Sequence, residues 1–346
     1  MNYIGSKLGL LDFLFDNINL IIDEKLKCKN NKIFCDLFAG MGNVSFKFYK
    51  EGWNVISNDV QEYSKVILNK MNFEKDVDLL KMQNLIEKKL NNFSKKGFFY
   101  KNYSDASLSK RLYFTEENAK IIDGARFLIE KFYLNSIINE IEKFYLLNCL
   151  LQAMNKVSNV VAVHEAFLKS FKESAKKRIN IKLIDGVNSK NKLAKNVIYN
   201  EDSLKLIKKI KGDILYLDPP YNSRQYSTNY HLYETLVKYD FPQINENSIT
   251  GIRKDVFKST FNKKHEVLNS LETIIKNANF KYIFISYNTD GILNKDIILN
   301  LLKKYGDAGV IELEHKRFKA KFKTYNETKL YELLFWLKLS ESLEII

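Results

Sequence analysis

A short segment near the middle of the chain carries the side chains best suited to chemistry. Residues 214–217 form an apolar run typical of a buried strand, and Asp218, Pro219, Pro220 and Tyr221 follow it directly. Proline has a fixed φ angle and no N–H donor, and it restricts the residue before it to extended geometry. The segment is therefore stiff, and it presents hydrogen-bond acceptors: the Asp218 carboxylate and the Pro219 carbonyl.

Acceptors in a rigid frame suit chemistry on an exocyclic amino group. The nitrogen of such a group is delocalised into its ring and is a poor nucleophile. Two hydrogen bonds accepted from its N–H groups would localise the lone pair, as electrostatic preorganisation for the transition state. Tyr221 offers a flat ring on which a base can stack. The alternative interpretation is a loop that merely ends a strand.

A glycine-containing turn, DLFAGMG at residues 36–42, is the second candidate site. Gly40 and Gly42 let the backbone turn sharply after a strand and approach a ligand closely. Asp59 ends the next strand about 20 residues on, where a carboxylate can bind ribose hydroxyls. The turn is neither G-x-G-x-x-G nor a P-loop, so the pattern favours S-adenosylmethionine over a dinucleotide or a nucleoside triphosphate. A plain tight turn is the alternative.

Alternating strands and helices position these two segments. We expect strands at residues 33–37, 53–59, 197–199 and 214–217, helices from about Asn43, Gln61 and Ser203, and three later strands, in YIFISYNTDG, GVIELEH and KLYELLFWLK. The last two are expected to form an antiparallel pair at the edge of a mostly parallel sheet. The order predicts an α/β fold.

A long stretch between these strands has a different character. Residues 72–194 show helical periodicity and no strand alternation, and connections of that length are usually functional. We therefore expect one α/β domain formed by residues 1–71 and 195–346, interrupted by a mostly helical insertion at 72–194.

Composition limits the class of partner. The 346 residues carry a formal net charge of +14, which favours nucleic acid first and an anionic membrane surface second. A lysine- and asparagine-rich composition bias is the alternative. The three cysteines have no CxxC spacing, so we expect a reducing compartment and no metal site. No secretion signal or membrane span is visible, and we expect a cytoplasmic protein without membrane association.

Taken in order, the motifs resemble those of Dam-like adenine-N6 DNA methyltransferases whose cofactor site lies near the N-terminus. The resemblance is carried by NYIGSK (2–7), DLFAGMG (36–42), ND (58–59), DPPYNSRQYSTNYH (218–231) and FISYNTDG (284–291). It implies a Rossmann-like methyltransferase fold and transfer of a methyl group from S-adenosylmethionine to N6 of an adenine flipped out of double-stranded DNA. It also implies a role as the modification enzyme of a restriction-modification system, paired with a restriction endonuclease. We expect a monomer.

The resemblance also assigns site residues. The flipped adenine would lie against Asp218, Pro219, Pro220 and Tyr221, and the insertion would be the target-recognition domain. The cofactor would contact Tyr3, Gly5, Lys7, Asp36, Phe38, Gly40, Gly42, Asp59, Asp202 and Asp218.

Contacts to DNA are predicted from charge and aromatic residues. Those after the proline pair are Arg224, Tyr226 and Tyr230, with the start of an amphipathic helix as the alternative. A basic run contributes Lys169, Lys172, Lys176, Lys177 and Arg178, with a solvated helical face as the alternative. Further candidates are Arg111, Arg126, Arg253 and the lysines and arginine of 316–323. For His231 a structural role is favoured over that of a general base.

Two other functions are compatible with these residues. One is an RNA adenine-N6 methyltransferase, which shares the catalytic chemistry. The other is a non-catalytic DNA-binding module that senses S-adenosylmethionine. The long extension after the proline pair and the large helical insertion favour DNA over RNA. The intact acid-Pro-Pro-aromatic set argues against pure binding, which has no use for acceptors aimed at an amine.

Overall fold

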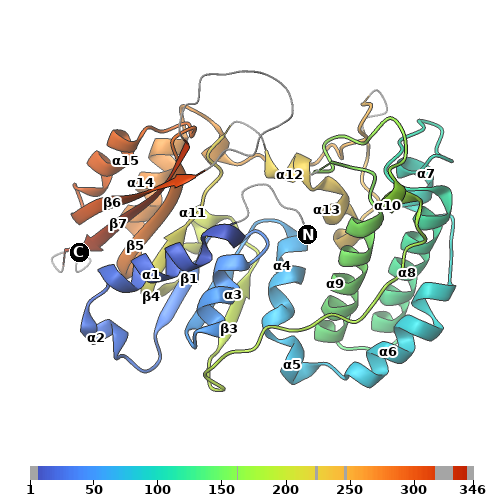
Figure 1. The fold of residues 1–346 in the computed structure, drawn as a ribbon, viewed down its shortest axis with the longest axis horizontal. Coiled ribbons are helices and arrows are strands. Elements are labelled where there is room, and N and C mark those ends of the chain that lie inside the picture. The colour runs from blue at the N-terminus through green and yellow to red at the C-terminus, as the bar shows by residue number, and fades with distance from the viewer. Residues whose placement is uncertain (1–6, 162, 223–224, 245–247, 316–329, 341–346) are drawn as a thin grey trace. The chain divides into compact units, whose positions relative to one another are not determined.

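A computed structural model describes residues 7–161, 163–222, 225–244, 248–315 and 330–340. Its core is a seven-stranded sheet in the order β3-β2-β1-β4-β5-β7-β6 (Figure 1). The strands are β1 (Ile33–Asp36), β2 (Asn54–Asn58), β3 (Asn196–Tyr199), β4 (Lys211–Leu217), β5 (Asn279–Asn288), β6 (Gly306–His315) and β7 (Leu330–Leu339).

The first five strands in this order run parallel, and β7 is antiparallel to both of its neighbours, β5 and β6. The predicted α/β sheet and its antiparallel edge pair are therefore confirmed.

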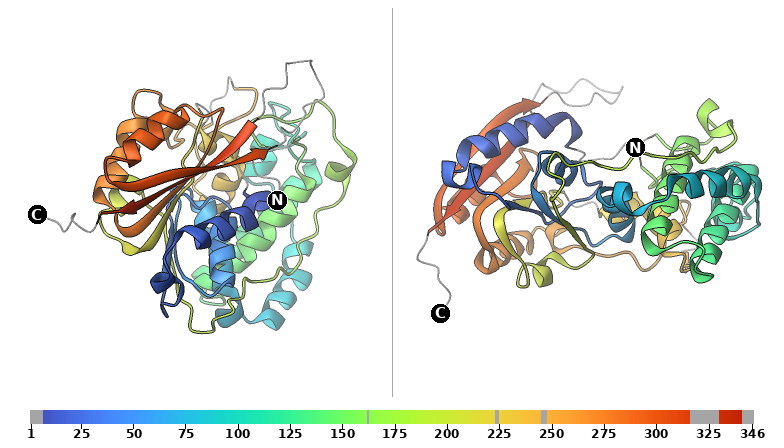
Figure 2. Two further views of the ribbon diagram at one scale, coloured as in Figure 1. Left: turned by 60° about the vertical axis from the view of Figure 1, so that its left-hand side comes forward. Right: turned by 90° about the horizontal axis from the view of Figure 1, so that it is seen from below.

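Helices cover both faces of the sheet (Figure 2). They are α1 (Leu11–Ile21), α2 (Glu24–Lys27), α3 (Asn43–Lys50), α11 (Ser203–Leu206), α14 (Val267–Asn277) and α15 (Lys295–Leu302). On one face Phe34 of β1 stacks on Phe48 of α3, with ring centroids 3.6 Å apart. On the other, alternate residues such as Cys35 and Leu215 join a buried cluster with Ile274 of α14. Strands buried on both faces need continuous apolar runs, which is what β1 and β4 have.

The chain divides into two compact units. The unit that contains the sheet, called the sheet unit below, comprises the described residues of 7–60, 189–225 and 258–346. The helical unit comprises those of 61–188 and 226–257. The bounds of the helical unit differ from those of the predicted insertion at 72–194, because the unit also takes in 61–71 and 226–257 and leaves out 189–194.

The added segments belong to the helical unit because of their packing. Tyr63 of α4 (Glu62–Leu68) lies against the rings of Tyr230 and Tyr233, and Glu234 of α13 (His231–Lys238) accepts the backbone N–H groups of Glu62 and Tyr63. Helical periodicity in a sequence predicts which face of a helix is buried. It does not predict which other element packs against that face.

Long helices form the rest of this unit, as the sequence predicts. They are α8 (Glu116–Leu134) and α9 (Glu140–Val157), accompanied by α5 (Phe73–Asp76), α6 (Leu79–Lys88), α7 (Phe98–Tyr103), α10 (Glu173–Lys176) and α12 (Tyr226–Asn229). Short 3-10 turns of this unit lie at Asn69–Met71 and Leu90–Asn92, and those of the sheet unit lie at Leu8–Leu10 and Thr260–Asn262. Asn139 and Glu142 form a capping box that starts α9. Among the described residues no helix is both long and apolar enough to cross a bilayer.

Candidate active site

Four predicted segments meet at one edge of the sheet. Asp36 ends β1, Asp59 follows β2, Asp202 follows β3 and Asp218 follows β4. These strands are parallel neighbours in the order β3-β2-β1-β4, so their carboxyl ends lie side by side. Ligands of open α/β sheets bind at this edge. The fold therefore brings the glycine turn and the proline segment together, as a common site requires.

The glycine turn has the left-handed geometry that its sequence predicts. Gly40 and Gly42 have φ angles of 51° and 76°, which residues with a Cβ rarely adopt. The Gly40 N–H donates to Oδ2 of Asp59 at 2.9 Å, and the Gly42 carbonyl accepts the Phe46 N–H to begin α3. In the structure Asp59 thus holds the turn in place, and its predicted contact with a ribose stays a prediction.

Asp36 is a buried carboxylate with one satisfied oxygen. Oδ2 accepts hydrogen bonds from the backbone N–H and the hydroxyl of Ser45 at 3.2 and 2.8 Å. Oδ1 has no hydrogen-bond partner among the described residues, although the side chain is 1% exposed. Burial raises the pKa of Asp36 to about 7, and the negative charges of Asp218 and Asp59 add to the effect against the bonds from Ser45. A buried acceptor without a donor is suited to a ligand that carries N–H groups.

Asp218 shares a cation with a second carboxylate. The Lys7 ammonium lies 3.3 Å from Oδ1 of Asp218 and donates to Oε1 of Glu332, which also accepts a hydrogen bond from Ser286 at 2.8 Å. Lys7 and Glu332 are 6% and 7% exposed, so water screens the three charges weakly. Glu332 is a site residue that the sequence analysis missed. Its only signal is a single acid within the apolar run of β7.

The charges around Asp218 set its protonation. Burial raises the pKa of Asp218 to about 6, Lys7 lowers it and Glu332 raises it. For Lys7 burial lowers the pKa, but the attraction of Asp218 and Glu332 outweighs burial and leaves the pKa above its ordinary value. Lys7 therefore stays charged, and it favours the ionised form of Asp218.

The segment after the prolines is fixed at several points. The Tyr221 carbonyl accepts the Ile292 N–H at 2.9 Å, and its ring meets Tyr287 edge-on with centroids 6.0 Å apart. The Lys7 ammonium lies 5.8 Å from the centre of the same ring. The side chain of Asn262 donates to the carbonyl oxygen of Asn222 at 2.7 Å. These contacts agree with a rigid segment, and the stacking of a base on Tyr221 stays a prediction.

The other predicted cofactor residues divide into described and undescribed ones. Asp202 caps α11 by accepting the Leu204 N–H at 2.9 Å, and the Phe38 ring packs edge-on against Phe261. A set of predicted contacts lies outside the described residues: Tyr3, Gly5, Arg224, the side chain of Tyr226 and the basic residues of 316–323.

One aromatic candidate for DNA contact is corrected by the structure. Tyr230 is 1% exposed, and its ring is enclosed by Tyr63 and Tyr233 in the helical unit. A ring with no exposed face cannot stack on a base, so Tyr230 stabilises the packing of α4 and α13 instead.

The basic run at 169–178 is a mostly irregular, exposed segment. Only Glu173–Lys176 is helical, so the alternative of a solvated helical face does not hold. The Lys172 ammonium donates to the Val160 carbonyl at 2.6 Å, and Lys176 pairs with Glu173. Arg178 lies 3.3 Å from Glu117, while Lys169 and Lys177 are exposed. Phosphate contact by this run stays a prediction.

The three further arginines are buried and structural, which corrects their prediction as readers of DNA. Arg111, Arg126 and Arg253 are 2–3% exposed. Arg111 and Arg126 donate to backbone carbonyls, and Arg253 pairs with Asp240 and Asp255. Guanidinium groups buried to this extent cannot reach a base edge, although Nη1 of Arg253 has no hydrogen-bond partner among the described residues.

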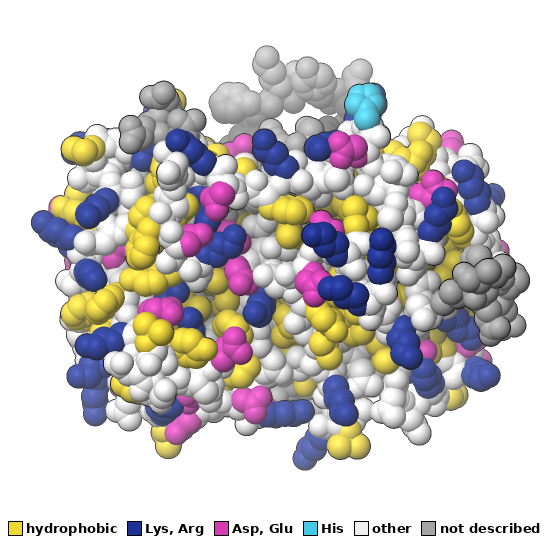
Figure 3. Space-filling view, turned by 180° about the vertical axis from the view of Figure 1, so that it is seen from behind, with side chains coloured by type: hydrophobic (Ala, Val, Ile, Leu, Met, Phe, Trp, Pro, Cys, Tyr) yellow, Lys and Arg dark blue, Asp and Glu magenta, His cyan; other side chains and the backbone are white. Residues whose placement is uncertain are grey.

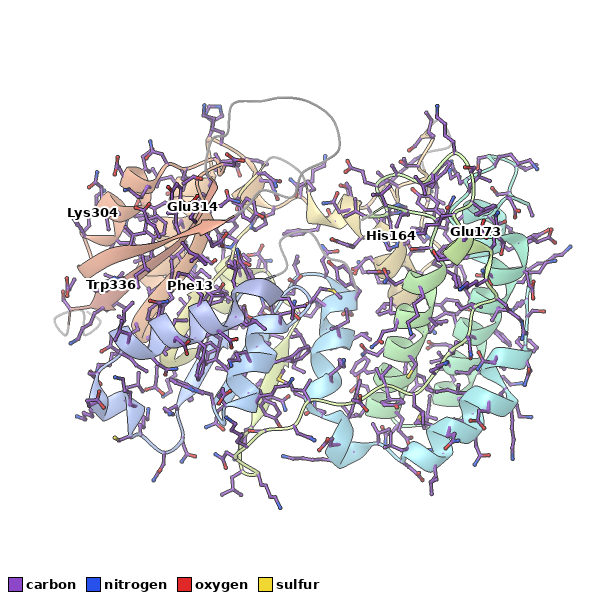
Figure 4. All side chains as sticks on the ribbon, in the orientation of Figure 1. Phe13, His164, Glu173, Lys304, Glu314 and Trp336 are labelled. Atoms are coloured by element: carbon purple, nitrogen blue, oxygen red, sulfur yellow. The ribbon has the colours of Figure 1, made fainter. Side chains whose placement is uncertain are left out.

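His231 has the structural role that the sequence analysis favoured. It is buried, and its Nε2 lies 3.0 Å from the carbonyl oxygen of His164, labelled in Figure 4. Burial lowers the pKa of His231 to about 4, so the ring is neutral. No group of three or more His, Cys, Asp or Glu side chains in the described part of the chain could hold a metal ion.

Comparison with known proteins assigns the family. The family model of the D12 class N6 adenine-specific DNA methyltransferases matches residues 3–300. The chain belongs to this family. The resemblance drawn from the motifs is confirmed, and the order and directions of the strands agree with the Rossmann-like methyltransferase fold it implies.

Three relatives show how far the similarity of this D12 class member extends. The type II methyltransferase M.NlaIII of Neisseria lactamica is 38% identical over 321 residues, which cover 92% of this chain and 93% of that protein. The type II methyltransferase M.CviAII of Paramecium bursaria Chlorella virus 1 is 34% identical over 99% of both chains. The type II methyltransferase M.FokI of Planomicrobium okeanokoites is 36% identical, and this chain spans 52% of its length.

Proposed function

We propose that this D12 class methyltransferase uses S-adenosylmethionine to methylate N6 of an adenine flipped out of double-stranded DNA. The observation that carries the proposal is the position of Asp218. It directly follows β4 and lies beside the Lys7 ammonium, on the same sheet edge as the left-handed glycine turn. A base amine and a methyl donor that bind at this edge would meet there.

The residues at the edge fit S-adenosylmethionine. Oδ1 of Asp36 is a buried acceptor to which no described residue donates, which suits the amino group of the methionine part. Gly40 and Gly42 carry no side chains, so that a ligand can approach the backbone closely at these two positions. When bound, S-adenosylmethionine would supply a methyl group on a positively charged sulfur, which departs as a neutral thioether.

The chain's own residues would prepare the amine. Asp218 and the Pro219 carbonyl would accept its two N–H groups and localise the lone pair on nitrogen. Lys7 keeps Asp218 ionised, because burial alone would raise the pKa of Asp218 further. Tyr221 would support the flipped base by stacking. The methylated nitrogen loses its surplus proton readily, so the site needs no strong base.

The test follows tritiated methyl transfer to duplex DNA. We expect Asp218→Ala to lower the rate by roughly 10²–10³-fold, the scale for losing a preorganised electrostatic contact. Asp16→Ala, at an exposed aspartate of α1, is the matched control and should keep the wild-type rate. Calorimetry would check that Asp218→Ala still binds S-adenosylmethionine. Equal transfer rates for wild type and Asp218→Ala would defeat the proposal.

Duplex DNA is the proposed substrate because the matching family is one of DNA methyltransferases. Supplying genomic DNA and total RNA in parallel would separate it from an RNA substrate. The type II relatives support a role in modification next to a restriction endonuclease. Single-molecule sequencing of DNA from expressing cells would read the methylated motif. The monomeric state and cytoplasmic location stay predictions.

A further inference from the structure

Three irregular loops of the helical unit are held together by buried polar side chains. They are residues 104–114, the described residues of 159–171, and 248–254, called the loop platform below. They lie at the end of the helical unit where α7, α10 and α13 are labelled in Figure 1. Bridges between Ser104 and Phe114 and between Ile244 and Arg253 close the first and third loops at their bases.

Arg111 joins the first loop to the third. It is 3% exposed, and its guanidinium donates to the carbonyl oxygens of Ser248 at 2.9 Å and Ile249 at 3.2 Å. A Cβ on Gly251 would lie 2.7 Å from Nε of Arg111, so the third loop packs against the guanidinium without room for a side chain. The φ angle of Gly251 is 66°, which also favours glycine.

Tyr113 and Asn159 join the second loop to the others. The Tyr113 hydroxyl lies 2.7 Å from the His164 carbonyl oxygen and 3.1 Å from that of Thr250. Asn159 is fully buried and donates to the Leu112 carbonyl at 2.9 Å. All three loops are therefore tied to one another by side chains of this network.

Irregular loops that are ordered by buried side-chain hydrogen bonds commonly serve as binding surfaces. Backbone outside helices and sheets loses its hydrogen bonds, and here buried side chains replace them. Ordered loops on a rigid scaffold are typical binding surfaces. The network therefore fixes the shape of a surface, whereas a plain connection between helices would need no such support.

The three loops of the platform carry exposed aliphatic and cationic side chains. Leu108 is fully exposed, and Ile249 and Val161 are 80% and 79% exposed. Exposed lysines accompany them, namely Lys110, Lys169 and Lys254. Within the described part of the chain, Lys169 and Lys254 form no ion pair. Single exposed aliphatic residues are common, but these three belong to loops that hydrogen bonds connect to one another, so one partner could contact all three.

We propose that the loop platform reads the base sequence around the target adenine in duplex DNA, an inference that rests on the proposed function. Leu108, Ile249 and Val161 would contact base edges, such as the methyl group of thymine, and the lysines would contact phosphates. Net charge does not locate such a surface, since Lys and Arg side chains are spread among acidic ones on the face in Figure 3. The three connected loops instead indicate where the DNA-reading surface lies.

The test is selection of bound duplexes from a randomised pool, which needs no methyl transfer. Wild type should retrieve one sequence motif. The Leu108→Ala/Ile249→Ala double variant should lose preference at one or more positions, with its affinity for the wild-type motif falling roughly 5- to 100-fold. Leu134→Ala, at a 72% exposed leucine of α8, is the matched control and should retrieve the wild-type motif. Thermal unfolding would check that the variants fold.

Lysine variants distinguish recognition of the base sequence from electrostatic attraction to the phosphates. Lys169→Ala/Lys254→Ala should weaken binding to all duplexes alike, and the slope of log affinity against log salt should fall by about 1 per lysine. The proposal is wrong if the double aliphatic variant retrieves the same motif as Leu134→Ala, or if wild type retrieves none. A different result would contradict the proposed function alone: wild-type protein that selects a motif but transfers no methyl group to it.

Discussion

Replacing Lys7 with Met removes the cation that lies 3.3 Å from Asp218 while keeping most of the side-chain volume. Asp218 then faces Glu332 and Asp36 without a compensating charge in the described structure. Because a positive neighbour lowers the pKa of a carboxyl group, its removal must raise the pKa of Asp218 above about 6.

The size of this shift follows from the geometry. Two unit charges 3.3 Å apart attract by ~5 kcal/mol at an effective dielectric constant of about 20. Asp218 keeps 17% exposure, so water screens part of this attraction and most of the energy is not realised as a shift. We expect the pKa of Asp218 to rise by about 1–2 units, or ~1.4–2.7 kcal/mol. Ionised Asp218 would then be roughly 2- to 10-fold scarcer at pH 7.

The assay is kcat for methyl transfer between pH 5.5 and 9.5 with both substrates saturating. For Lys7→Met the acid limb should move to higher pH, and activity should recover toward pH 9. Glu332→Gln removes a negative neighbour of Asp218, so its acid limb should move to lower pH. The two variants thus predict shifts of opposite sign, and calorimetry would report S-adenosylmethionine binding in each.

A merely structural role for the ion pairs would lower kcat at every pH and leave the limb in place. The electrostatic reasoning would be refuted if the acid limb of the kcat profile stayed at the same pH in both variants. It would also be refuted if the acid limb of Glu332→Gln moved to higher pH, because Glu332 would then act chiefly by holding Lys7 against Asp218.

Three further predictions concern the cofactor turn and the helical unit. Gly42→Ala places a Cβ at a φ of 76°, which costs about 1–2 kcal/mol, and should weaken S-adenosylmethionine binding in calorimetry. Gly9→Ala, with no heavy atom within 4 Å of its Cβ, should leave binding unchanged. Glu234→Gln weakens the two bonds to the start of α4 and should lower the free energy of unfolding by about 1–3 kcal/mol in denaturant titrations, an effect absent if those bonds do not form. Burial lowers the pKa of His231 to about 4 and of His164 to about 3, so stability should fall as pH drops from about 6.5 toward 4. His231→Gln should make this slope shallower, and an equal slope would contradict a neutral buried ring.

The sequence by itself determined the chemistry and the order of the elements. Strand ends, the glycine turn and the proline segment are local features, since each depends on φ preferences and apolar runs of a few residues. Parallel strands then place their carboxyl ends at one edge, so the sequence alone assigns Asp36, Asp59 and Asp218 to one site.

Only the tertiary structure decided which polar side chains face one another. Glu332 lies 325 residues from Lys7 in the chain, and the residues next to Glu332 in the sequence do not predict that the two side chains pair. Arg111 and Tyr230 look like DNA contacts in the sequence, yet the fold encloses both. The same side chain can satisfy its charge with a phosphate or with a buried carbonyl, and the choice depends on segments far away in sequence. For the same reason the helical unit extends past the predicted insertion, because α4 and α13 bury their faces against each other.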